Sequence, residues 1–166
     1  MKKSILSFNT TMSRLCLLVA LIAATASARA AAGDEITLDG MTYTVNDDGT
    51  TVTLTSATSV TGEVTVPSEV TSDGTTFEVT AIGDSAFMNN TLVTSVTVSD
   101  GVTSIGSYAF GKCTSLTSIQ LPDGLETIDQ YAFYYCSLLT EIKIPDGVTF
   151  IPAYAFQACK GLTKIY

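Results

Sequence analysis

Three kinds of side chain that could do chemistry recur at one fixed spacing in the C-terminal half of the chain. Each series advances by 23 residues, and the members are Cys113, Cys136 and Cys159, then Tyr108, Tyr131 and Tyr154, then Asp100, Asp123 and Asp146. Thiols in such a series could form disulfides, stacked tyrosines could bind sugar rings, and stacked carboxylates could bind calcium. Each chemistry competes with a structural explanation, and the neighbouring residues decide between the two.

The cysteine series is better explained by packing than by disulfides or a metal. Three thiols in one row cannot all pair, and Asn90 stands where a cysteine would fall one step earlier. Stacked coils lie about 4.8 Å apart, which is close to disulfide reach, but no CxxC pair provides a metal-ligand spacing. We therefore predict a row of small buried thiols, with one disulfide in the row as the alternative.

The aspartates and tyrosines also have structural explanations. Each aspartate precedes a glycine in a turn, and the glycine-rich nonapeptide of calcium-binding β-rolls is missing. The tyrosines are expected to stack on one another with their hydroxyls in water, and a sugar-stacking surface is the alternative. The sequence therefore predicts no metal site and no cofactor.

No constellation of residues indicates an enzyme. The chain contains no histidine, which excludes histidine-based triads and histidine metal sites. It has neither a nucleophile elbow nor a phosphate-binding loop, and its acids lie in turns rather than in a cleft that would hold a carboxylate pair. We predict that the protein is not an enzyme, and a glycan-active enzyme remains a minor alternative.

The same step of 23 residues runs through the apolar positions, and a period in this range is typical of leucine-rich solenoids. The six apolar columns are Phe87, Phe110, Phe133 and Phe156; Ile82, Ile105, Ile128 and Ile151; Val93, Leu116, Leu139 and Leu162; Val96, Ile119, Ile142 and Ile165; Val98, Leu121 and Ile144; and Val102, Leu125 and Val148. A single coil cannot bury its apolar face, but stacked coils bury a continuous one.

One coil can be read as local structure. The segment 116–121, LTSIQL, alternates as a strand does, and PDG at 122–124 is a turn in which glycine provides a positive φ. LETI at 125–128 is a second short extended piece. DQYAFYYC at 129–136 is expected to make a tight helical turn that Asp129 caps.

The repeated pattern L-T-x-I-x-L-P-D-G-V-x-x-I-x-x-Y-A-F-x-x-C resembles that of the BspA-like leucine-rich repeat family. The resemblance covers residues 79–166, and the first repeat departs from it at Ser85, Asn90 and Ser99. It implies a mainly β leucine-rich-repeat solenoid of 23-residue coils. It also implies a secreted or cell-surface protein that acts in adhesion, often with host matrix proteins as partners.

The chain divides into three segments. Residues 1–32 hold four basic residues, no acid, an apolar run at 15–26 and A-x-A-like cleavage sites, which is typical of a signal peptide. Residues 33–77 lack the period and contain a predicted hairpin at 41–55, so we expect an N-terminal β cap, with a separate ligand-binding domain as the alternative. Residues 78–166 are predicted to form about four repeat coils, the last one incomplete.

The charge of the chain bears on its partners and its location. Residues 33–166 carry four Lys or Arg and sixteen Asp or Glu, a formal net charge of −12. Phosphates would be repelled and no basic patch exists, so we expect no nucleic-acid partner. The apolar run is too short for a comfortable span of about 20 residues, so we predict no membrane span after signal removal. We expect the protein to be secreted or at the cell surface.

Function is expected on the outward positions of the strands, because the apolar columns must point inward. The outward positions are Ser95, Thr97, Ser118, Gln120, Glu141, Lys143 and Lys164. We predict that a protein partner, from the extracellular matrix or another cell surface, contacts Ser118, Gln120, Glu141, Lys143 and Lys164. The alternative is a structural spacer, or stalk, belonging to a larger surface protein.

Overall fold

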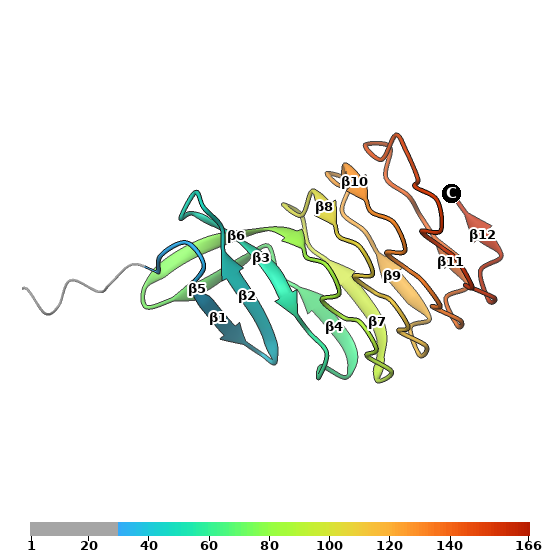
Figure 1. The fold of residues 1–166 in the computed structure, drawn as a ribbon, viewed down its shortest axis with the longest axis horizontal. Helices are drawn as coiled ribbons and strands as arrows, with labels where there is room; N and C mark the ends of the chain where they lie inside the picture. The colour runs from blue at the N-terminus through green and yellow to red at the C-terminus, as the bar shows by residue number, and fades with distance from the viewer. Residues whose placement is uncertain (1–29) are drawn as a thin grey trace, which may run out of the picture.

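The structure, a computed structural model, describes residues 30–166, and the predicted signal peptide lies almost wholly outside this range. Within residues 30–166 the regular structure is entirely β-strand (Figure 1). This part of the chain contains no helix with the length and apolarity needed to cross a bilayer.

In the described part of the chain, twelve strands follow one another and group into three sheets. They are β1 (Glu35–Leu38), β2 (Met41–Val45), β3 (Thr51–Ser56), β4 (Gly62–Val66), β5 (Glu69–Ser72), β6 (Thr75–Ile82), β7 (Val93–Val98), β8 (Ser104–Ile105), β9 (Ser118–Gln120), β10 (Thr127–Ile128), β11 (Glu141–Ile142) and β12 (Lys164–Ile165).

The predicted hairpin at 41–55 is confirmed, because β2 and β3 pair antiparallel. The Asp48 carboxylate organises its turn by accepting hydrogen bonds from the Thr50 and Thr51 amides at 2.6 and 2.8 Å. The Thr51 hydroxyl donates to the same carboxylate at 2.6 Å. These bonds, led by that from the Thr51 side chain, hold the pKa of Asp48 below its usual range.

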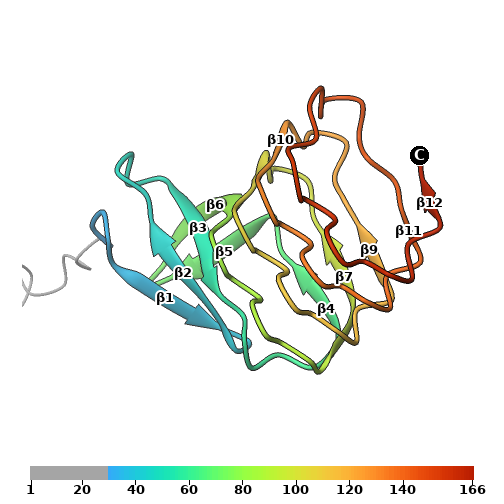
Figure 2. The ribbon, with the colours of Figure 1, turned by 45° about the vertical axis from the view of Figure 1, so that its right-hand side comes forward.

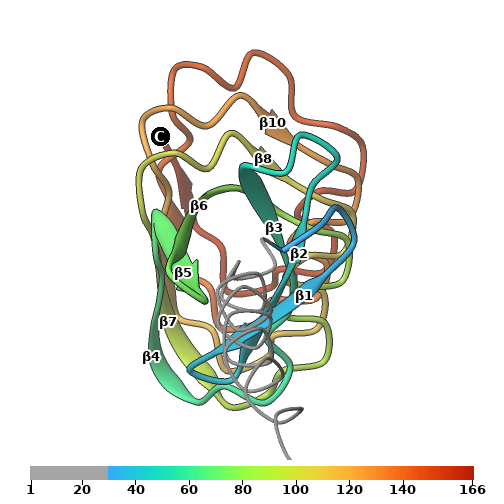
Figure 3. The ribbon, with the colours of Figure 1, turned by 90° about the vertical axis from the view of Figure 1, so that its left-hand side faces the viewer.

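The solenoid is built from two ladders of parallel strands on opposite sides of the coil. One ladder contains β3, β6, β8 and β10, and β1 and β2 extend it at the N-terminal end. The other begins with β4, β7 and β9, which pair in register, and continues along the stack with β11 and β12 (Figure 2). Figure 3 looks along the stack and shows β4 and β7 on one side, with β1, β2 and β3 on the other.

The columns predicted from the 23-residue period form the core. Phe87, Phe110 and Phe133 are fully buried. Their rings stack with centroids 4.8 and 5.3 Å apart, which is about the separation of neighbouring coils. Burial weakens in the last coil, where Ile151 and Ile165 are 41% and 51% exposed. The fold is therefore a leucine-rich-repeat solenoid whose core is continuous up to its last coil.

The helical turn predicted for residues 129–136 is wrong, because the segment is a series of tight turns. Tyr131 and Tyr135 both have a φ of 60°, which a right-handed helix does not allow. The Phe133 and Tyr135 amides donate to carbonyls of the next coil at 2.9 and 2.8 Å. These amides bond between coils rather than within a helix, so stacking determines the conformation.

The glycines of the repeated Asp-Gly turns differ from the prediction. A positive φ, of 102°, occurs at Gly101 but at neither Gly124 nor Gly147. Gly147 is required because a larger residue has no room there: a Cβ would lie 2.6 Å from the Leu125 carbonyl oxygen. At Gly124 a Cβ would meet no atom within 4 Å.

Gly147→Ala is therefore expected to lower the free energy of unfolding by about 1–3 kcal/mol, as overpacking does. Gly124→Ala is the matched control at the same place one coil earlier, and it should change stability by less than about 1 kcal/mol. Urea denaturation of the two variants provides the comparison. Equal losses would contradict the close stacking of the turns.

Candidate binding face

The residues predicted to contact a partner lie together on one face of the solenoid. Ser118 and Gln120 on β9, Glu141 and Lys143 on and beside β11, and Lys164 on β12 are all exposed. The inward neighbours Ile119 and Ile142 are buried. We call the surface formed by the outward side chains of β7, β9, β11 and β12 the outer sheet face.

Two rows of side chains cross the outer sheet face. In one row, Ser95 pairs in register with Ser118, and Glu141 with Lys164. The Ser118 hydroxyl donates to the Ser95 hydroxyl at 2.9 Å. The row changes from small hydroxyls to charged groups toward the C-terminal end, while the buried columns beneath keep their apolar character.

The charges on this face are paired within the face. The Lys143 ammonium lies 3.8 Å from the Asp123 carboxylate. The Lys164 ammonium lies 4.0 Å from Glu141. All four side chains are more than half exposed, so each pair contributes at most about 1 kcal/mol to stability. The ion pairs fix where these charges lie on the face and add little to folding.

Sequence reasoning missed Asp123 and Tyr166 as members of this face. The Tyr166 hydroxyl donates to the Glu141 carboxylate at 3.0 Å, and this bond, with burial as a smaller cause, raises the pKa of Tyr166. The repeat provided a signal, because Tyr166 follows Lys143 by the common step. Asp123 was interpreted only as a turn residue.

The face also extends toward the N-terminus beyond the repeats. Glu63 and Thr65 on β4 pair in register with Ser95 and Thr97 on β7, and both β4 residues are exposed. The interval from Glu63 to Ser95 differs from the repeat step, so the period could not have identified the first rung.

The tyrosine series stacks on itself. Tyr108 and Tyr131 have ring centroids 4.7 Å apart and planes only 6° from parallel, and Tyr131 and Tyr154 lie 5.2 Å apart. Tyr134 packs edge-on against the first two rings. Because Tyr131 has another ring on each side, its faces are unavailable to a sugar, which favours the packing interpretation.

Cys113, Cys136 and Cys159 are all free, and the predicted row of buried thiols holds for Cys113 and Cys136, whereas Cys159 is only partly buried. The Cys113 thiol donates to the Phe87 carbonyl at 3.1 Å, and the Cys136 and Cys159 thiols repeat this bond one and two coils later. Burial raises the pKa of Cys113 to about 12, and a hydrogen bond with Cys159 together with burial raises that of Cys136. These two thiols are therefore protonated at neutral pH, and the reactive thiolate is disfavoured.

The aspartate series shows no gathering of ligands. Asp100, Asp123 and Asp146 are exposed, and Asp123 pairs with Lys143. Within residues 30–166 no three His, Cys, Asp or Glu side chains come together in a way that could hold a metal ion.

Comparison with known proteins identifies similar sequences and structures. Residues 78–166 match the profile of the BspA type leucine rich repeat region, in six copies. A leucine-rich repeat protein from Bacteroides capillosus ATCC 29799 is 35% identical with a TM-score of 0.72, over 80% of this chain and 96% of that one. No curated protein matches the chain.

Two further solved structures share the fold. The T. pallidum leucine rich repeat protein is 25% identical with a TM-score of 0.64, over 80% of this chain and 71% of that one. A leucine rich cell surface protein from Faecalibacterium prausnitzii A2-165 is 28% identical with a TM-score of 0.60. The latter comparison covers 80% of this chain but only 42% of that one.

Proposed function

Because the chain belongs to the BspA-type leucine-rich repeat family, we propose that it is an exported module that binds a protein partner on its outer sheet face. The observation that carries this proposal is the contrast between the two sides of each strand. Ile119 and Ile142 repeat inward, whereas Gln120 and Lys143, at equivalent outward positions, differ in size and charge. Solenoids use such extended sheet faces for binding, and variation there sets specificity without altering the core.

The proposed partner is a protein of the extracellular matrix or of another cell's surface, so the activity is adhesion. A relative described as a cell surface protein supports a secreted or surface location. The mixed rows of hydroxyl, amide, carboxylate and ammonium groups suit a polar protein surface. The solved relatives are described as repeat proteins and none by an enzymatic activity, which supports a binding role.

Exchanging the charges of Glu141 and Lys143 tests the face. The double variant Glu141→Lys with Lys143→Glu keeps the net charge but places like charges beside Lys164 and Asp123. Binding to matrix proteins or cells, measured by surface plasmon resonance, is expected to weaken about tenfold, because the complementary charge pattern is reversed. Thermal stability should change by no more than about 1 kcal/mol, since all the groups are exposed.

A matched control places the same exchange elsewhere. Lys112→Glu with Glu126→Lys also conserves net charge at two exposed positions that lie off the outer sheet face. This control should bind as the unchanged protein does. If the control loses binding equally, or if binding persists in the first variant but fails after Tyr131→Ser with Tyr154→Ser, the outer sheet face is not the site. Absence of binding to every matrix protein and cell type would favour the spacer.

A further inference from the structure

The strand β4 has a free edge at the N-terminal end of the solenoid. Within residues 30–166 it is the terminal strand of its sheet and pairs with β7 alone. The N-terminal strands β1, β2 and β3 extend the opposite ladder. Figure 3 shows β1 to β3 on one side of the coil and β4 on the other, where β5 also lies near the viewer; β5 pairs with β6 and not with β4.

The free edge presents backbone hydrogen-bonding groups of Glu63 and Thr65. The Gly62 amide donates to the Leu92 carbonyl and the Val66 carbonyl accepts from the Ser99 amide, both at 3.0 Å, so these residues face β7. Successive residues of a strand alternate, so the amides and carbonyls of Glu63 and Thr65 point away from β7. No group within residues 30–166 bonds to the backbone of either residue on that side.

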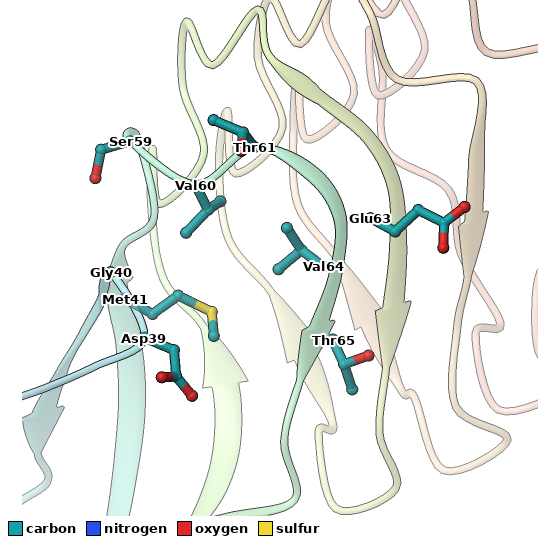
Figure 4. Close-up of a pocket in the computed structure, with 9 residues that line it drawn as sticks. All are labelled: Asp39, Gly40, Met41, Ser59, Val60, Thr61, Glu63, Val64 and Thr65. Atoms are coloured by element: carbon teal, nitrogen blue, oxygen red, sulfur yellow. The ribbon is translucent and has the colours of Figure 1, made fainter.

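A hollow beside this edge has the character of a side-chain pocket. Figure 4 shows the Val60 and Val64 side chains directed into the space that Asp39 and Met41 border, whereas Glu63 points away from it. Val64 is half-buried although its column neighbours Val96 and Ile119 are buried. Val64 is partly open because no strand among the described residues pairs with β4 on its N-terminal side.

The acidic side chains around the β4 edge favour a cationic segment over a second copy of the chain. Among residues 30–166, those that line the hollow include the Asp39 carboxylate and no lysine or arginine, and the Glu63 side chain adds a second carboxylate on the outer side of β4. A second copy of the chain would be acidic too, because residues 33–166 carry sixteen acids and only four basic residues. Edge-to-edge pairing of two β4 strands would also bring the Glu63 and Asp39 carboxylates of both copies together. Like charges disfavour that pairing, whereas a cationic segment is attracted.

We propose that β4 accepts an extended, basic segment of a protein partner as an added strand. Its backbone pairs with the amides and carbonyls of Glu63 and Thr65, in the manner of strand addition to a sheet edge. A lysine or arginine on its outer side lies beside Glu63, and an apolar side chain at the adjacent position covers Val64 and Val60. This edge is separate from the charged part of the outer sheet face, so either site can exist without the other.

The probe is a capped hexapeptide of alternating lysine and valine, titrated against the full chain. Amide hydrogen exchange and nitrogen–proton chemical shifts, measured by NMR, should respond at Glu63 and Thr65, whose exchange is expected to slow at least about tenfold on saturation. A peptide with glutamate in place of lysine should bind at least about tenfold more weakly. A peptide methylated on every amide nitrogen should not bind, because neither of its edges can donate the hydrogen bonds of the ladder.

Variants of the chain separate the edge from the rest of the surface. Thr65→Pro removes the Thr65 amide, which points away from β7, and leaves the hydrogen bonds to β7, since proline is tolerated at a sheet edge. In this variant the peptide should no longer slow hydrogen exchange at Glu63. Glu63→Lys should weaken binding about tenfold, whereas the control Glu69→Lys, an equal charge change at an exposed position on β5, should weaken it far less. A thermal melt of each variant verifies folding.

Four outcomes would overturn the proposal. One is equal binding of the methylated and unmethylated peptides, and another is a shift pattern centred on Glu141 and Lys143 instead of β4. The third is protection of the Glu63 amide without any peptide, accompanied by a dimer in sedimentation, which would make a second copy the occupant. Failure to bind the peptide at millimolar concentration would also count against it.

Discussion

Phe133→Ala is expected to lower the free energy of unfolding by about 3–5 kcal/mol, the usual cost of removing a fully buried phenylalanine. The Phe133 ring is buried and lies between two others, 5.3 Å from Phe110 and 5.2 Å from Phe156. Alanine leaves a cavity that neighbouring coils cannot close, because each coil is fixed by hydrogen bonds to the next. Chemical denaturation gives the loss directly.

Phe156→Ala is the internal control for this prediction. Phe156 is at the same position one coil later, is only partly buried and, among residues 30–166, stacks on another ring on one side alone. Its removal should cost less than half as much, since the last coil can relax or fray. If both variants lost the same stability, the continuous stack would not be the source of the effect.

Asn90→Ala is expected to cost about 3–4 kcal/mol, because Asn90 is a buried polar hub at the first repeat coil. Its amide donates to the Ala57 and Val60 carbonyls at 2.9 and 2.8 Å. Its side-chain oxygen accepts from the Leu92 and Val93 amides at 2.9 and 3.0 Å. Alanine would leave four backbone groups without these partners, and each buried unpaired group costs about 1–3 kcal/mol unless water reaches it.

Cys113→Ala provides the comparison at the same repeat position one coil later. Cys113 makes one hydrogen bond, from its thiol to the Phe87 carbonyl, so about 1–2 kcal/mol should be lost. Asn90→Asp should be costly as well, because it retains the acceptor but removes both donors and buries a carboxyl group. Thermal melts of the three variants would contradict this account if Asn90→Ala were no worse than Cys113→Ala.

The sequence was sufficient to predict the fold where side-chain type alone decides the outcome. An inward position must be apolar in every coil, so Phe87, Phe110 and Phe133 showed both the period and the core. The alternation around Ile119 placed Ser118 and Gln120 outward for the same reason. Antiparallel pairing around Asp48 followed from turn chemistry, which is also local.

Features that depend on contacts between coils could not be predicted in this way. The turns at 129–136 have helix-compatible residues, but their amides bond to the next coil, and Tyr131 takes a left-handed φ. The hydrogen bonds of the Asn90 amide go to Ala57 and Val60, which are 33 and 30 residues earlier in the chain and outside the 23-residue period. The free edge of β4 required knowledge of which ladder the N-terminal strands join.

The regular spacing of partners has a consequence for how the gene can change. The hydroxyls of Thr103, Thr117 and Thr163 each donate to a carbonyl 23 residues earlier, and the thiol of each repeat cysteine to one 26 residues earlier. Unequal crossing-over between two copies of the repeat adds or deletes a whole coil and restores an equivalent partner to every interior group.

A frame-preserving deletion that is not a whole number of coils lacks this property, because it would shift other residues into the places of Phe110 and Ile119. The protein can therefore gain or lose whole coils, and the side-chain types of its buried columns stay the same when it does. Outward positions such as Gln120 and Lys143 are free of that constraint, so the number of coils and the chemistry of the outer sheet face can change independently.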